Sequence, residues 1–113
     1  MPMTHDEMTA RAIAVSDLCH AAEKQAYASL AATMELGSKM MEFCADVGES
    51  PISSRKTIAD IKSSIDCGFT ALEKVGSAHV RAEHKIKEMG DFPPLCPKQR
   101  DEGSTVSHLR EVA

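Results

Sequence analysis

Aromatic residues are scarce in this sequence, and their scarcity limits the kind of fold that the chain can form. The 113 residues include no tryptophan, one tyrosine and three phenylalanines, which together make up 4% of the chain. β-Sandwiches and barrels use aromatic and β-branched side chains for their packed faces. A core made of Ala, Met, Leu, Ile and Val lets helices approach closely, so the composition favours an all-α fold.

An excess of positive charge is also lacking. The chain has a formal net charge of −4, whereas a nucleic-acid-binding protein needs a basic surface that releases counterions from phosphate. Catalytic motifs are missing as well, since there is no glycine-rich phosphate loop, no GxSxG elbow and no HExxH. We therefore expect no nucleic acid as partner and no enzymatic activity.

Long apolar runs do not occur either. No stretch approaches the roughly 20 apolar residues of a membrane-spanning helix, and the N-terminal MPMTHDEM lacks the basic and apolar regions of a signal peptide. We expect no membrane span and a cytoplasmic location. The cysteines Cys19, Cys44, Cys67 and Cys96 should then be reduced.

Helix-stopping residues divide the chain into two long helical stretches. Thr4 can cap a first helix, which the pattern predicts over about 5–46. Gly48 and Pro51 then predict a break, and a second helix is expected over about 54–89. Because a short loop makes long helices antiparallel neighbours, the sequence predicts a helical hairpin.

The chain beyond the second helix differs in composition. We expect a hairpin domain over 1–90 and a tail over 91–113. Pro93, Pro94 and Pro97 favour an extended segment. The later VSHLREV can form a short terminal helix.

The second helix carries a seven-residue repeat. One row consists of Ile58, Ile65, Leu72, His79 and Ile86, and its partner row of Ile61, Gly68, Val75, Ala82 and Met89. Such rows predict a coiled-coil-like seam. The residues expected to carry helix–helix interaction are Ile58, Ile61, Ile65, Leu72, Val75, His79 and Ile86.

The first helix offers a seam together with additional apolar residues. Its predicted rows are Met8, Val15, Ala22, Ser29, Leu36 and Phe43, and Ala12, Cys19, Ala26, Thr33, Met40 and Val47. Apolar residues expected outside the seam are Ile13, Leu18, Leu30, Met34 and Met41, with Phe69 on the second helix. We expect two hairpins to cover them by pairing into a homo-oligomeric four-helix bundle. The alternative is a monomeric three-helix arrangement in which the tail folds back over the hairpin.

Polar residues occur together at one level of the predicted hairpin. With the turn near residue 50, residues whose numbers add up to about 100 face one another, which brings together Cys19, His20, His79 and Glu83. These residue types bind zinc and other transition metals, but no CxxC, HxxH or ExxH element accompanies them. We therefore expect no metal and no other cofactor, and interpret His79 as a seam residue that sets helix register. A pH-sensitive seam is another alternative.

The function predicted from these features is that of a non-enzymatic interaction protein. We expect an adaptor, an inhibitor or a regulatory subunit that binds another protein through a self-associating helical bundle. One alternative is a metal- or ligand-binding four-helix bundle. A further alternative is an amphipathic helical protein that coats granules or lipid surfaces.

Overall fold

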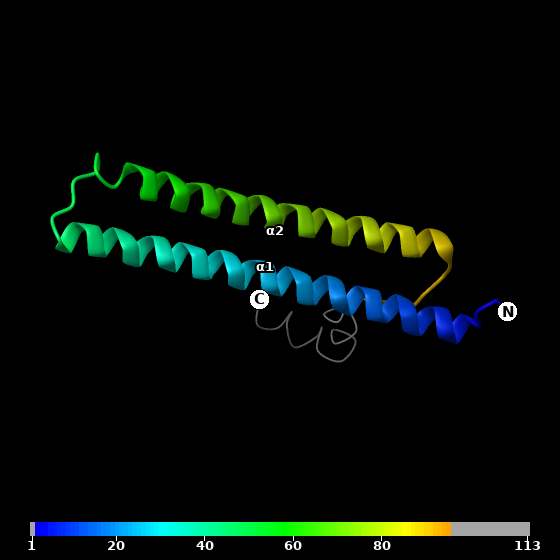
Figure 1. Ribbon diagram of the computed structural model, residues 1–113. Helices are drawn as coiled ribbons and strands as arrows, with labels where there is room; N and C mark the ends of the chain where they lie inside the picture. The colour runs from blue at the N-terminus through cyan, green and yellow to red at the C-terminus, as the bar shows by residue number, and fades with distance from the viewer. Residues whose placement is uncertain (1, 96–113) are drawn as a thin grey trace, which may run out of the picture. The chain divides into compact units, whose positions relative to one another are not determined.

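Two long α-helices make up the regular structure of the chain. The computed structural model describes residues 2–95, in which α1 spans His5–Asp46 and α2 spans Arg55–Met89 (Figure 1). No strand occurs within that range. The all-α helical hairpin is therefore confirmed, with both helices within one residue of their predicted bounds.

The chain divides into two compact units, and each contains part of both helices. The first unit combines the chain up to Ala22 with the chain from Ser77 onward, and the second is Glu23–Gly76. The expected division into a hairpin domain over 1–90 and a tail over 91–113 stays a prediction. Cys96, Pro97 and the predicted terminal helix lie outside the described residues.

The start of α1 is fixed by a reciprocal pair of hydrogen bonds. The backbone N–H of Glu7 donates to Oγ1 of Thr4 over 3.1 Å, and the N–H of Thr4 donates to Oε2 of Glu7 over 3.1 Å. This is a capping box, which satisfies two N–H groups that the helix leaves without a partner. The predicted cap at Thr4 is confirmed.

The end of α1 follows the predicted glycine stop. Gly48 has a φ of 74°, a left-handed conformation that glycine adopts at little cost. Its N–H donates to the carbonyl of Ala45 over 3.2 Å, while the N–H of Glu49 donates to the carbonyl of Cys44 over 2.9 Å. These two bonds form a Schellman motif, which satisfies the last carbonyls of the helix.

Close packing of α1 against α2 defines the second unit. Leu30 is 6% exposed, and a Cβ atom placed on Gly68 would lie only 2.8 Å from its Cδ1 atom. Further along, a Cβ atom on Gly37 would lie 3.0 Å from Cγ2 of Ile61. The hydroxyl of Ser54, just before α2, donates to Sγ of Cys44 over 3.7 Å. Each pair has residue numbers that add up to about 100, as the antiparallel pairing predicts.

The seam of α2 lies where the repeat predicts it. Every residue of the two predicted rows is half-buried except Met89, which is 60% exposed and was therefore assigned wrongly. Met89 is the last residue of the helix, which explains its exposure. The expected interaction residues Ile58, Ile61, Ile65, Leu72, Val75, His79 and Ile86 all lie on this half-buried face. Their part in binding another chain stays a prediction.

The seam of α1 differs from the prediction in one of its two rows. The row from Ala12 to Met40 is buried or half-buried as expected, although Val47 lies past the end of the helix and is exposed. The row from Met8 to Phe43 is wrong, because all its members after Met8 are exposed. The row one residue later replaces it, with the members Thr9, Ser16, Glu23, Leu30, Gly37 and Cys44.

Side-chain size explains this correction. Ser16 and Gly37 are small, so the backbone of α2 can approach α1 closely at their positions. Leu30 was expected outside the seam but is buried, because Gly68 leaves room for its side chain. Phe43, a member of the predicted row, is 60% exposed.

The described start of the tail contacts α1 within the first unit. The ring of Phe92 stacks on His5, with centroids 5.6 Å apart and planes at 4°. Leu95 is only 9% exposed. Pro93 and Pro94 lie between Phe92 and Leu95 and outside any helix. The alternative of a monomeric three-helix arrangement stays a prediction.

Candidate functional site

The helix contact becomes polar in the first unit. Ser16 is 2% exposed and His20, one turn further along α1, is half-buried. On α2, the side chain of His79 is only 13% exposed. Burial of polar groups costs free energy unless they are hydrogen-bonded or bind a ligand. A simple packing surface would place aliphatic side chains at these positions.

His79 contacts polar side chains on both helices. Its ring lies against that of His20, with centroids 4.6 Å apart and planes at 78°, which is an edge-to-face arrangement. Its Nε2 atom lies 2.9 Å from Oε1 of Glu83, one turn further along α2. When Nε2 carries the proton, His79 donates this hydrogen bond to the carboxylate. Glu83 thereby fixes the orientation of the ring.

The structure brings together three of the four residues that the sequence singled out. His20, His79 and Glu83 lie together in the first unit. Cys19, the fourth, is half-buried. Imidazole nitrogens and carboxylate oxygens are ligands that first-row transition metals accept.

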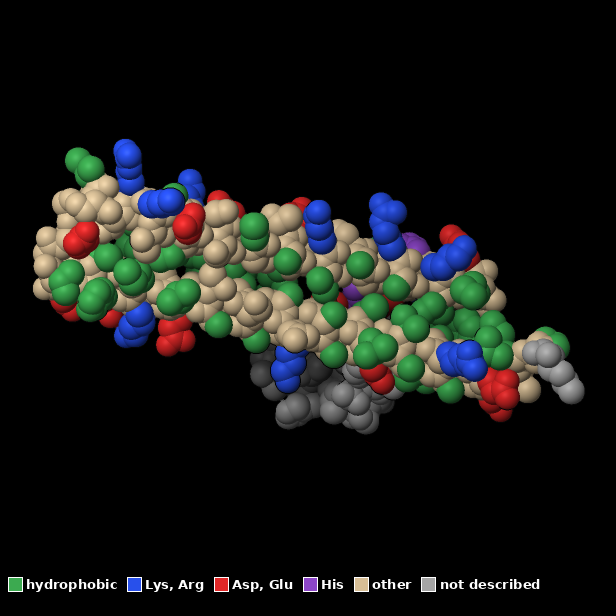
Figure 2. Space-filling view, viewed as in Figure 1, with side chains coloured by type: hydrophobic (Ala, Val, Ile, Leu, Met, Phe, Trp, Pro, Cys, Tyr) green, Lys and Arg blue, Asp and Glu red, His purple; other side chains and the backbone are tan. Residues whose placement is uncertain are grey.

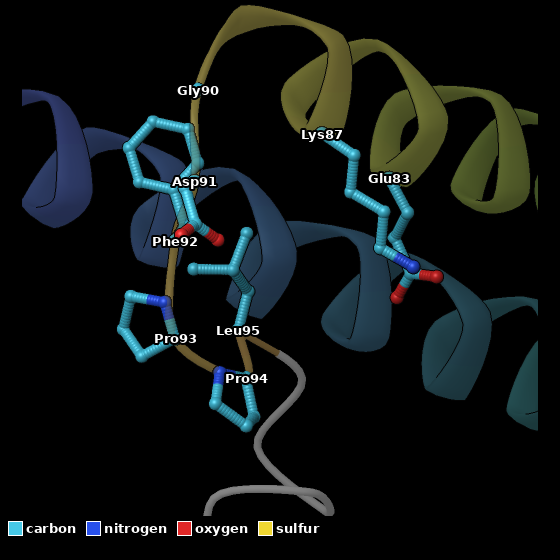
Figure 3. A pocket seen from close by; sticks show the side chains of 8 residues that line it. All are labelled: Glu83, Lys87, Gly90, Asp91, Phe92, Pro93, Pro94 and Leu95. Atoms are coloured by element: carbon cyan, nitrogen blue, oxygen red, sulfur yellow. The ribbon is translucent and has the colours of Figure 1, made fainter.

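A hollow beside this cluster opens on the surface of the first unit. It is lined by Glu83 and Lys87 of α2 and by the chain from Gly90 to Leu95 (Figure 3). Figure 3 shows Glu83 and Lys87 extending from the same side of α2, with the chain from Gly90 to Leu95 leaving the end of that helix. Glu83 therefore lines the hollow and also contacts His79.

The exposed apolar side chains are a second candidate for a functional surface. No large side chain within residues 2–95 is fully buried, and many apolar ones are exposed. Figure 2 shows such side chains open to solvent on α1 near the α1–α2 connection. Neither helix, however, is apolar over a stretch long enough to cross a membrane.

Comparisons with protein-family models, curated proteins and solved structures gave no match. The function is therefore inferred from the geometry and chemistry of the chain itself.

Proposed function

We propose that this chain is a non-enzymatic interaction protein that works as a self-associated helical bundle. It would serve as an adaptor, an inhibitor or a regulatory subunit. The observation that carries the proposal is the set of large apolar side chains that α1 leaves exposed. The proposed occupant of this surface is a second copy of the chain.

The exposed apolar residues of α1 follow the same seven-residue repeat as its seam. On one side of the seam, the exposed fractions are 42% for Val15, 62% for Leu36 and 60% for Phe43. On the other side, they are 63% for Tyr27, 47% for Met34 and 38% for Met41. Rows spaced by seven residues fit the surface of another long helix. A second α1 offers such a surface with the same spacing.

Measurement of mass in solution tests the proposal. We expect light scattering coupled to size-exclusion chromatography to give at least twice the chain mass. The double variant Leu36→Glu/Phe43→Glu should elute as a monomer, because it places two charges among the exposed apolar residues. The matched control Gln25→Glu/Ala28→Glu adds the same two charges at exposed positions of α1 outside these rows and should keep the parent's mass.

Two outcomes would overturn the proposal. One is a parent that stays monomeric at concentrations up to about 100 μM, well above the micromolar range of weak specific contacts. The other is a parent whose mass the Leu36→Glu/Phe43→Glu change leaves unaltered, which would exclude these rows from the interface. Circular dichroism must show that both double variants keep the parent's helicity.

A further inference from the structure

A second hollow in the first unit has an almost entirely apolar lining. It has a volume of about 200 Å³ and lies where the start of α1 meets the end of α2. All its lining residues belong to the chain up to Ala22 or to the chain from Ser77 onward. The large apolar side chains around it are those of Met3, Met8, Val15, Ile86, Met89 and Phe92. We call this site the methionine hollow.

We propose that the methionine hollow binds a medium-chain fatty acid. The acyl chain, of about eight to ten carbon atoms, occupies the hollow, and the carboxylate lies at Arg11. The proposal goes beyond the interaction function and does not rest on self-association, because one chain supplies the whole hollow.

The size and the lining of the hollow suit an acyl chain. An apolar cavity of about 150 Å³ holds one benzene molecule. The methionine hollow is larger, so it has room for about eight carbon atoms, and its open side lets a chain extend toward solvent. Methionine side chains are unbranched and flexible, so they adapt to the shape of a ligand. Binding would also cover Met3 and Met89, which are 45% and 60% exposed.

Arg11 gives the described lining its only charge. Its side chain is exposed, and it makes no ion pair within residues 2–95. Glu7, one turn earlier on α1, accepts the hydrogen bond from the N–H of Thr4 instead. A guanidinium group binds a carboxylate through paired N–H groups. A ligand with one apolar chain and one carboxylate therefore matches the hollow and Arg11 together.

Two other occupants match the hollow less well. A second copy of the chain would use the exposed rows of α1, but Val15 is the one member of those rows that lines the hollow. An anionic membrane surface attracts clusters of basic residues. Here a single Arg11 follows Asp6 and Glu7, the acidic residues of the first turn of α1.

Calorimetric titration of the full chain with fatty acids tests the site. Hexanoate, octanoate and decanoate are added as sodium salts at concentrations below micelle formation. We expect octanoate to bind with a Kd of about 0.1–1 mM, in the range usual for a ligand of that size. Two added carbon atoms should tighten binding by about 10-fold until the hollow is filled.

Substitution of Arg11 tests recognition of the carboxylate. Arg11→Gln should weaken octanoate binding by about 2–5-fold, as loss of an exposed ion pair does. The same variant should bind 1-octanol, which has no charge, like the parent. Arg11→Lys keeps the positive charge and should retain most of the affinity for octanoate.

Substitution of Met89 locates the acyl chain. Met89→Glu should weaken octanoate binding by at least about 10-fold, because it removes apolar contact and adds a charge of the ligand's own sign. Met89→Leu, which keeps an apolar side chain of similar volume, should bind like the parent. The matched control Val80→Glu adds the same charge at a position of α2 that is 54% exposed and outside the lining. Circular dichroism must show parental helicity in each variant.

Four outcomes would overturn the site. The first is a parent that binds none of the three acids up to about 10 mM, well above the expected Kd. The second is equal weakening by Met89→Glu and Val80→Glu, which would place the acid elsewhere. The third is Arg11→Gln that binds octanoate like the parent, which would exclude recognition of the carboxylate. The fourth is a lower mass in solution for Met89→Glu than for Val80→Glu, which would identify a second copy as the occupant.

A vesicle experiment separates a free acid from a membrane surface. The chain is sedimented with vesicles of phosphatidylcholine and phosphatidylglycerol, without added fatty acid. We expect it to stay in the supernatant. A chain that sediments with the vesicles, and whose sedimentation Met89→Glu abolishes while Val80→Glu does not, would overturn the proposal in favour of a membrane surface.

Discussion

The two helices bury apolar residues in different ways. On α2 the half-buried positions form one narrow face, and the neighbouring positions are mostly polar. On α1 the seam contains small and polar residues such as Ser16 and Glu23, while Leu36 and Phe43 lie outside it. A helix with apolar residues on several sides belongs in the middle of a bundle, whereas a one-sided helix belongs at its surface. Under the proposed self-association, α1 would therefore have more than one helical neighbour.

The two helices also contribute different side chains to the contact between them. α2 supplies branched aliphatic side chains such as Ile61 and Ile65, and α1 receives them at Gly37, where the distances to a built Cβ atom are 3.0 and 3.5 Å. A regular aliphatic row therefore packs against a surface of small residues. Changes to α2 should disturb the fold of a single chain, and changes to the exposed rows of α1 should disturb assembly.

The largest effect is expected at the aliphatic row of α2. Ile65→Asp places a charge without a partner in the helix contact and should lower the free energy of unfolding by about 3–5 kcal/mol. That is a large part of a typical total of about 5–15 kcal/mol. Thermal melting followed by circular dichroism should show loss of the cooperative transition. Thr70→Asp, at an exposed position of α2, should melt close to the parent, and equal melting of both variants would refute the assigned seam.

A smaller effect on stability is expected for the leucines of α1, and it should differ between buried Leu30 and exposed Leu36. Leu30 is 6% exposed and Leu36 is 62% exposed. Leu30→Ala should lower the free energy of unfolding by about 2–4 kcal/mol at every protein concentration, because it removes buried surface and leaves a cavity. Leu36→Ala should lower it by less. Its effect on stability should grow with protein concentration, because it acts on the proposed assembly. Denaturant unfolding at low and high micromolar concentration distinguishes them, and identical concentration dependence would contradict the proposed roles.

Much of the fold follows from local signals in the sequence. Thr4, Gly48 and the heptad rows of α2 each have a direct physical meaning, and the structure has caps and a seam where they predict them. The antiparallel pairing follows from the short loop alone, so the meeting of His20 with His79 could be predicted.

The register of α1 could not be predicted in the same way. Its apolar residues lie on several faces, so the row that begins at Met8 and the row that begins at Thr9 fit the sequence about equally well as partner of the row from Ala12 to Met40. The choice between them depends on which α1 positions meet glycine and small residues across the contact, as Leu30 meets Gly68. Glu23 was likewise not expected in the seam, because it belongs to the row that the predicted frame leaves outside.

The smallest expected effect tests the close approach of Gly68 on α2 to Leu30 on α1. Replacement of a helical glycine with alanine usually stabilises by about 0.5–1 kcal/mol, because glycine loses more backbone entropy on folding. A Cβ atom on Gly76 would meet nothing within 4 Å, so Gly76→Ala should show this full gain. Gly68→Ala should instead lower stability by about 1 kcal/mol, since its Cβ atom would lie 2.8 Å from Leu30.

A double-mutant cycle identifies the cause of that loss. In a Leu30→Ala background the obstructing side chain is absent, so Gly68→Ala should change from destabilising to neutral or stabilising. Denaturant unfolding of the four chains measures the coupling, which we expect to be about 1–2 kcal/mol. If Gly68→Ala and Gly76→Ala stabilise equally in the parent, Leu30 can move aside without cost, and the contact of α1 with α2 at this point is looser than the burial of Leu30 indicates.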